Sequence, residues 1–102
     1  MSASLWLEGE DKHVPLCDMT YNLTPMLTAA GLPSWDCFAG MEAQAAGWIF
    51  ARARDNLMSD RARFEALEPA NGWGTYWAAV EQLSVMADRC KESPRLRVGA
   101  WL

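Results

Sequence analysis

The sequence predicts an α+β domain in which three to four helices pack on a small antiparallel sheet, and three observations predict it. Apolar and polar residues alternate at both ends of the chain, which is the period of a half-buried strand. Between the ends, apolar residues recur every three or four positions, which is the period of a helix. The 102 residues show no break in composition, and 51% are hydrophobic. We therefore expect a single domain, 1–102, with its own core.

An N-terminal hairpin and a C-terminal strand are predicted to form the sheet. Residues 3–8 alternate, with Leu5 and Leu7 on one side, and residues 13–20 follow a polar connection. Within residues 95–102, four apolar residues share one face: Leu96, Val98, Ala100 and Leu102. Because sequence-distant strands would otherwise leave unpaired edges, we expect the last strand to join the hairpin.

The helices are predicted in the middle of the chain. Thr24 has the chemistry of an N-cap for a first short helix, which Gly31 can close. The longest helix is predicted over approximately residues 40–58, with a core stripe formed by Met41, Ala45, Trp48, Ile49, Ala53 and Leu57. Ser59 is predicted to cap another short helix. The most periodic segment, 75–91, predicts a last helix whose buried stripe is Tyr76, Val80, Leu83, Ala87 and Cys90.

Charge and composition exclude several classes of protein. The net charge is −4, and residues 1–51 hold six acids against one base, so a surface for duplex nucleic acid is not expected. No apolar run approaches the roughly 18 residues that span a bilayer, and acids interrupt the N-terminus where a signal peptide would be apolar. These features predict a cytoplasmic protein without a membrane partner.

Neither a metal site nor a cofactor is predicted. Cys17, Cys37 and Cys90 are odd in number and widely spaced, so they are expected to be buried free thiols. His13 is the only histidine, and its place at a strand start favours a solvated role. Four carboxylates could still converge across the hairpin and keep a small carboxylate-based enzyme open as an alternative: Glu8, Glu10, Asp11 and Asp18.

The stretch NGWGTYW, residues 71–77, is the main candidate site. Asn71-Gly72 is a turn dipeptide, and the glycines beside Trp73 leave room for its indole to stand in a cleft with Tyr76 or to pack down as a plug. We expect Trp73 to line a concavity shared with Tyr76 and the turn at Asn22. Arg52 and Arg54 belong to an arginine-rich segment that suits phosphate or carboxylate recognition, although interleaved acids favour a salt-bridged helix face.

Two segments resemble a known group of proteins. TYNLTPMLTAAG (residues 20–31) and PANGWGTYWAAVEQL (residues 69–83), with Cys90 and an arginine-containing last strand, are similar to a group of short uncharacterised proteins of actinobacterial phages and their hosts. The shared pattern maps onto Asn22, Pro25, Met26, Asn71, Gly72, Trp73, Gly74 and Tyr76. Where members often continue Tyr-Glu-Gly, this chain has Tyr76-Trp77-Ala78. The resemblance implies a phage accessory protein and brings no established activity.

Three functions follow as hypotheses. The first is a non-catalytic accessory protein that binds a host protein as a counter-defence or host-takeover inhibitor, with the six tryptophans as a source of anchors. The second is a binder of a small anionic ligand, such as a sponge for a nucleotide signal, in which Trp73 or Tyr76 stacks a base and arginines hold phosphates. The third is the carboxylate-based enzyme. The sequence favours the first and leaves a homo-oligomer open.

Overall fold

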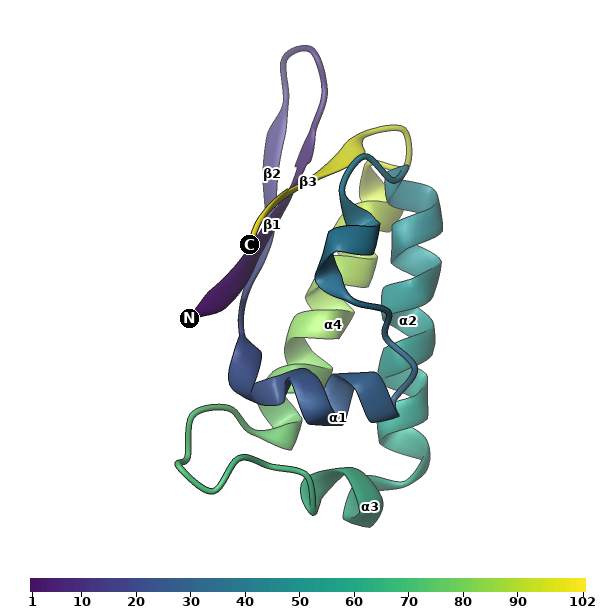
Figure 1. The fold of residues 1–102 in the computed structure, drawn as a ribbon. Helices are drawn as coiled ribbons and strands as arrows, with labels where there is room; N and C mark the ends of the chain where they lie inside the picture. The colour runs from purple at the N-terminus through teal and green to yellow at the C-terminus, as the bar shows by residue number, and fades with distance from the viewer.

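The computed structural model describes all 102 residues and has the predicted α+β fold (Figure 1). In chain order its strands, helices and two 3-10 turns are β1 (Ser2–Glu8), β2 (His13–Thr20), η1 (Tyr21–Leu23), α1 (Thr24–Ala29), η2 (Trp35–Phe38), α2 (Ala43–Ser59), α3 (Arg61–Glu65), α4 (Tyr76–Glu92) and β3 (Arg97–Trp101). The helices lie on one side of the sheet, and α2 and α4 stand beside each other as the longest elements (Figure 1). No helix combines the length and the apolar composition needed to cross a membrane.

The sheet joins the two ends of the chain as predicted. Its strand order is β2-β1-β3, and both pairings are antiparallel. Leu5 lies opposite Cys17 on one side and Ala100 on the other, so the apolar face of β1 continues across the sheet. The register of β2 shifts after Leu5, which leaves Leu16 as an extra residue, and its side chain is buried.

The segment that leads into β3 also accepts hydrogen bonds from the first residues of α2. No side chain caps this helix, and its first amides donate to carbonyls of the other chain end: Ala43 N to Leu96 O at 2.8 Å and Gln44 N to Pro94 O at 3.1 Å. These bonds satisfy donors that a helix N-terminus leaves free. The amide and the carbonyl of Val98 both form hydrogen bonds with the backbone of residues 40–41. These bonds cover the outer edge of β3 at that point.

The ends of α1 differ slightly from the prediction. Thr24 is the first helical residue and not the cap, because the preceding turn is already 3-10 helical. The capping side chain belongs to Thr20, whose hydroxyl accepts a hydrogen bond from the backbone of Asn22 at 3.2 Å. Gly31 closes the helix as predicted, with a φ of 91° that glycine adopts without strain.

The cap of α3 was also predicted one residue too early. The Ser59 hydroxyl donates back to the Asn56 carbonyl at 2.6 Å and so belongs to the end of α2. The next residue, Asp60, is the N-cap and has a non-helical backbone, and its carboxylate accepts from the amide of Arg63 at 3.4 Å. A carboxylate at this end also complements the helix dipole.

The core stripe of α2 was predicted correctly at Ala53 and Leu57 but wrongly at Trp48 and Ala45. The buried positions follow three- and four-residue steps through Ala43, Ala46, Phe50, Ala53 and Leu57, whereas Trp48 and Ala45 are exposed. The reason lies at Gly47, where an added Cβ would lie 2.8 Å from the Cβ of Cys90 on α4. The two helices are in close contact at this glycine, so small residues face α4 and the large indole is turned outward.

All three cysteines are free, but they differ in exposure. Cys90 is buried and Cys17 is half-buried, while Cys37 is exposed, which corrects the expectation that all three are buried. Burial raises the pKa of the Cys17 thiol to about 12 and that of the Cys90 thiol to about 11. Both thiols therefore stay protonated at neutral pH, and a protonated thiol is a poor nucleophile.

Candidate functional site

The stretch Asn71–Trp77 turns the chain into α4. Gly72 and Gly74 have φ values of 78° and 115°, a region that residues with a Cβ rarely adopt. Between them, the amide of Trp73 donates to the side-chain oxygen of Asn71 at 2.9 Å, which closes an Asx turn. Thr75 then caps the helix by accepting from the amide of Ala78 at 3.0 Å.

This stretch touches the turn that contains Asn22. A Cβ added at Gly74 would lie 2.8 Å from Leu23 Cγ and 3.2 Å from Thr20 Cγ2. Asn22 itself is exposed, and its side chain donates to the Thr20 hydroxyl at 3.2 Å. The structure therefore brings the two segments into contact, but by close packing at a glycine and not around a concavity shared with Tyr76, whose side chain is buried.

Tyr76 has a packing role in this arrangement. Its side chain is only 1% exposed, and its hydroxyl donates to the carbonyl of Leu57 at 2.8 Å. That carbonyl lies in the last turn of α2, where carbonyls lack a partner within the helix. The Tyr76 ring is out of reach of a surface ligand and instead ties the start of α4 to the end of α2.

We expect Tyr76→Phe to lower the free energy of unfolding by about 1 to 3 kcal/mol. The change keeps the ring and leaves the Leu57 carbonyl buried without its hydrogen bond, which is the costly way to lose such a bond. Urea unfolding of both proteins measures the difference. Tyr21→Phe is the matched control, because the Tyr21 hydroxyl makes no hydrogen bond within the chain. Equal stability of Tyr76→Phe and the parent would contradict the assigned role.

The helix α3 and the loop after it form one end of the molecule (Figure 1). Large side chains are exposed in this part of the chain. Trp73 is 70% exposed and Trp77 is 52% exposed. The Arg61 guanidinium lies 4.8 Å from the centre of the Trp77 ring, a cation–π contact. We call this region the tryptophan end; its members are Met58, Arg61, Leu67, Trp73 and Trp77.

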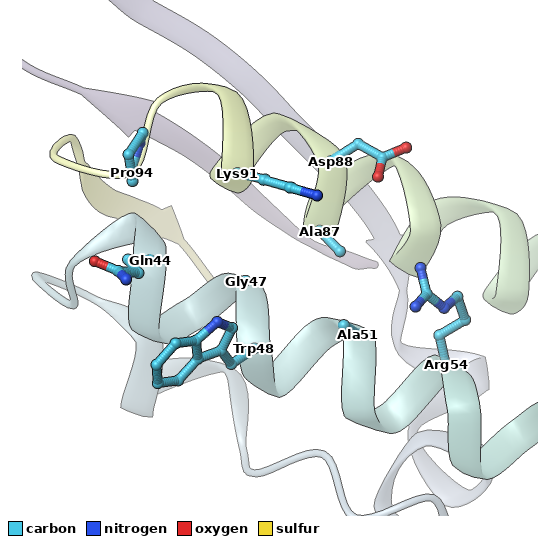
Figure 2. Close-up of a pocket in the computed structure, with 9 residues that line it drawn as sticks. All are labelled: Gln44, Gly47, Trp48, Ala51, Arg54, Ala87, Asp88, Lys91 and Pro94. Atoms are coloured by element: carbon cyan, nitrogen blue, oxygen red, sulfur yellow. The ribbon is translucent and has the colours of Figure 1, made fainter.

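A second feature is a groove of about 560 Å³ between α2 and α4 (Figure 2). Its small side chains come from both helices, and charged or aromatic side chains stand around them. The nine residues that line it are Gln44, Gly47, Trp48, Ala51, Arg54, Ala87, Asp88, Lys91 and Pro94. We call it the α2/α4 groove.

The α2/α4 groove combines one indole, two cations and one carboxylate. Trp48 is 72% exposed on α2, and the Arg54 guanidinium reaches from the same helix toward α4 (Figure 2). Arg54 Nε also donates to the carboxylate of Asp55 at 3.1 Å. Lys91 and Asp88 stand on α4. These groups offer a stacking surface, charge for an anion, and an acceptor for hydroxyl donors.

Sequence reasoning selected Arg54 and missed Trp48, Asp88 and Lys91. A signal was available, because Gln44, Trp48, Ala51 and Arg54 follow steps of four, three and three residues and so share one face of α2. The signal was hidden because Trp48 was assigned to the core. Arg52, the other predicted arginine, lines a separate pocket with Pro33 and Asn56, so the structure does not bring it together with Arg54.

Two of the hairpin carboxylates, Asp18 and Glu8, do not converge. The Asp18 carboxylate accepts from the hydroxyls of Ser2 at 2.6 Å and Ser4 at 3.1 Å, and these bonds lower the pKa of Asp18. Glu8 accepts from the indole of Trp6 at 3.0 Å. Asp18 pairs with Ser4, which is four residues from Glu8 along β1, or about 13 Å at the rise of a strand. No three His, Cys, Asp or Glu side chains form a group that could hold a metal ion.

His13 and Trp6 complete the exposed face of the sheet. Their rings stack with centroids 5.8 Å apart, and the Trp6 indole covers Gly99, where an added Cβ would lie 2.3 Å from its Nε1. His13 is exposed, in line with the solvated role expected for it.

Comparison of the chain with protein-family models, with curated proteins and with solved structures found no match.

Proposed function

We propose that this chain is a non-catalytic accessory protein that acts by binding a protein partner and occupying its surface. One observation carries the proposal: both tryptophans of the tryptophan end are more than half exposed, at 70% for Trp73 and 52% for Trp77. Tryptophan is usually largely buried in a folded monomer, and it is enriched among the residues that dominate protein–protein binding energy.

The tryptophan end is the part of this surface best suited to a partner. Trp77 is held between two neighbours, since Arg61 covers its face and the Tyr76 ring meets it edge-on at 5.1 Å. An aromatic side chain that is already ordered loses little conformational entropy on binding. Trp73 stands on a turn that Asn71 closes by a hydrogen bond. The two indoles and an arginine thus combine the residue types that anchor interfaces.

A phage setting with a host protein as the partner belongs to the same proposal. Its support is the resemblance of residues 20–31 and 69–83 to proteins of actinobacterial phages and their hosts. The contact of Gly74 with Thr20 and Leu23 gives a physical reason for the two motifs to occur together, because a side chain at position 74 would separate them. An inhibitor of this kind needs no catalytic group, since occupancy of the host surface suffices.

The test has two steps. The tagged protein first captures a partner from an actinobacterial host lysate, and the Kd of the captured protein is then measured for the parent and for matched variants. We expect Trp73→Ala to weaken binding about thirtyfold or more, as removal of a hot-spot residue typically costs about 2 kcal/mol. Its unfolding free energy should change by less than about 0.5 kcal/mol, because the side chain is exposed. Trp101→Ala, at the far edge of the sheet, is the matched control and should bind as the parent does.

Two results would contradict the proposal. One is a captured protein that binds the parent and Trp73→Ala equally well, because the tryptophan end would then not be the interface. The other is a large loss of stability in Trp73→Ala, which would make the indole a packing residue. Capture of the chain by a second copy of itself would replace the host partner by a homo-oligomer.

A further inference from the structure

We propose that the α2/α4 groove binds a nucleoside monophosphate, with the base on Trp48, the phosphate between Arg54 and Lys91, and the ribose beside Asp88 (Figure 2). This site shares no residue with the tryptophan end. The inference therefore goes beyond the proposed partner binding and does not depend on it.

The size of the groove follows from the packing of two helices. Gly47 brings α2 against Cys90 of α4, and beyond this contact the short side chains of Ala51 and Ala87 leave the space between the helices unfilled. The resulting volume of about 560 Å³ lies within the range of about 300 to 1,000 Å³ that is common for small-molecule sites. A mononucleotide is a ligand of that size class.

Trp48 supplies the stacking surface. Its neighbours on the buried side of α2, Gly47 and Phe50, account for the packing of the helix without it, and its indole lies largely in solvent at the wall of the groove. A nucleobase that stacks on this ring would cover apolar surface that the fold leaves uncovered. Stacking on an aromatic side chain tolerates any base, so this contact alone does not select one.

The two cations of the groove come from opposite walls. Lys91 stretches from α4 in the direction of Arg54, whose guanidinium points back toward α4 (Figure 2). The Arg54 side chain is only 26% exposed, and its bond to Asp55 orients the planar guanidinium. A phosphate placed between these groups can accept hydrogen bonds from both helices, with Arg54 as the directional donor and Lys91 as the mobile charge.

Asp88 decides which kind of anion fits. A carboxylate beside Lys91 works against a ligand that carries negative charge alone. It becomes favourable when the ligand also has hydroxyl donors near its phosphate, because an ionised carboxylate only accepts hydrogen bonds. A ribose has such hydroxyls, and acidic side chains bind ribose hydroxyls in dinucleotide-binding folds. The set of one indole, two cations and one carboxylate therefore fits a nucleotide better than a simple aromatic acid.

Isothermal titration calorimetry of the full chain with the four ribonucleoside 5′-monophosphates tests the site. We expect at least one of them to bind with a Kd below about 1 mM, and at least about tenfold more tightly than its nucleoside or inorganic phosphate, because both ends of the ligand contribute. Trp48→Ala should weaken binding about fivefold or more, as loss of base stacking does. Lys91→Ala should do the same and reduce the salt dependence.

Matched variants show whether a nucleotide binds at the α2/α4 groove or elsewhere on the surface. Trp101→Ala removes an equally exposed indole and Lys12→Ala an exposed lysine on the hairpin, and both should bind as the parent does. Asp88→Asn tests the ribose contact: it should weaken a ribonucleotide and leave the 2′,3′-dideoxynucleotide unchanged. Tighter binding of both nucleotides by Asp88→Asn would show a bare anion site and overturn the assignment of the ribose. Absence of binding by all four nucleotides, or equal binding by Trp48→Ala and the parent, would overturn the site.

Discussion

Deletion of residues 95–102 is expected to unfold the domain. The deletion removes Val98, which is buried in the core, and exposes one edge of the central strand β1. It also removes the Leu96 carbonyl that accepts the first amide of α2, a helix whose N-terminus no side chain caps. Loss of a helix cap alone lowers the free energy of unfolding by about 0.5 to 2 kcal/mol. The free energy of unfolding of the whole domain is expected to be only about 5 to 15 kcal/mol.

Thermal unfolding followed by circular dichroism tests this prediction. The truncated chain should show no cooperative transition, since core, sheet and helix cap are lost together. Deletion of Leu102 alone is the control: this residue lies beyond β3 and is exposed, so the unfolding free energy should change by less than about 0.5 kcal/mol. A cooperative melt of the 95–102 deletion within a few degrees of the parent would show that β3 is dispensable.

The sheet was predictable because each strand carries its own alternation. Leu5 and Leu7 are buried on one face of β1, and Val98 continues that face on β3, whereas Leu102, which was predicted to share it, is exposed beyond the end of the strand. α4 was predictable for a similar reason, since its buried stripe from Tyr76 to Cys90 repeats over the whole helix. In both cases the local pattern and the tertiary contacts select the same face.

The face of α2 and the candidate groove were not predictable in the same way. Two stripes of α2 have helical spacing, and the choice between them depends on the contact of Gly47 with Cys90, a residue from the other end of the chain. Helical spacing alone placed Trp48 in the core stripe and thereby hid the groove that Trp48 lines. The burial of Tyr76 was predicted by its place on the stripe of α4, but no local pattern indicates that its hydroxyl finds a partner in Leu57.

Two aromatic residues of α2, only two positions apart, give the sharpest test of the face that the helix buries. Phe50→Ala is expected to lower the free energy of unfolding by about 3 to 5 kcal/mol, because the ring is completely buried and stacks on Phe38 at 4.8 Å, so its removal leaves a cavity. Trp48→Ala removes a larger side chain and should change stability by less than about 0.5 kcal/mol, because most of the indole is in solvent.

Urea unfolding of the two variants decides which stripe faces the core. Alanine is the better helix former in both cases, so a change in helix propensity cannot account for opposite results. The comparison also tests the ligand site, since Trp48→Ala must remain folded if its loss of nucleotide binding is to be read as the loss of a contact. A greater loss of stability for Trp48→Ala than for Phe50→Ala would return the indole to the core, and with it α2 would have to rotate and the α2/α4 groove would lose its wall.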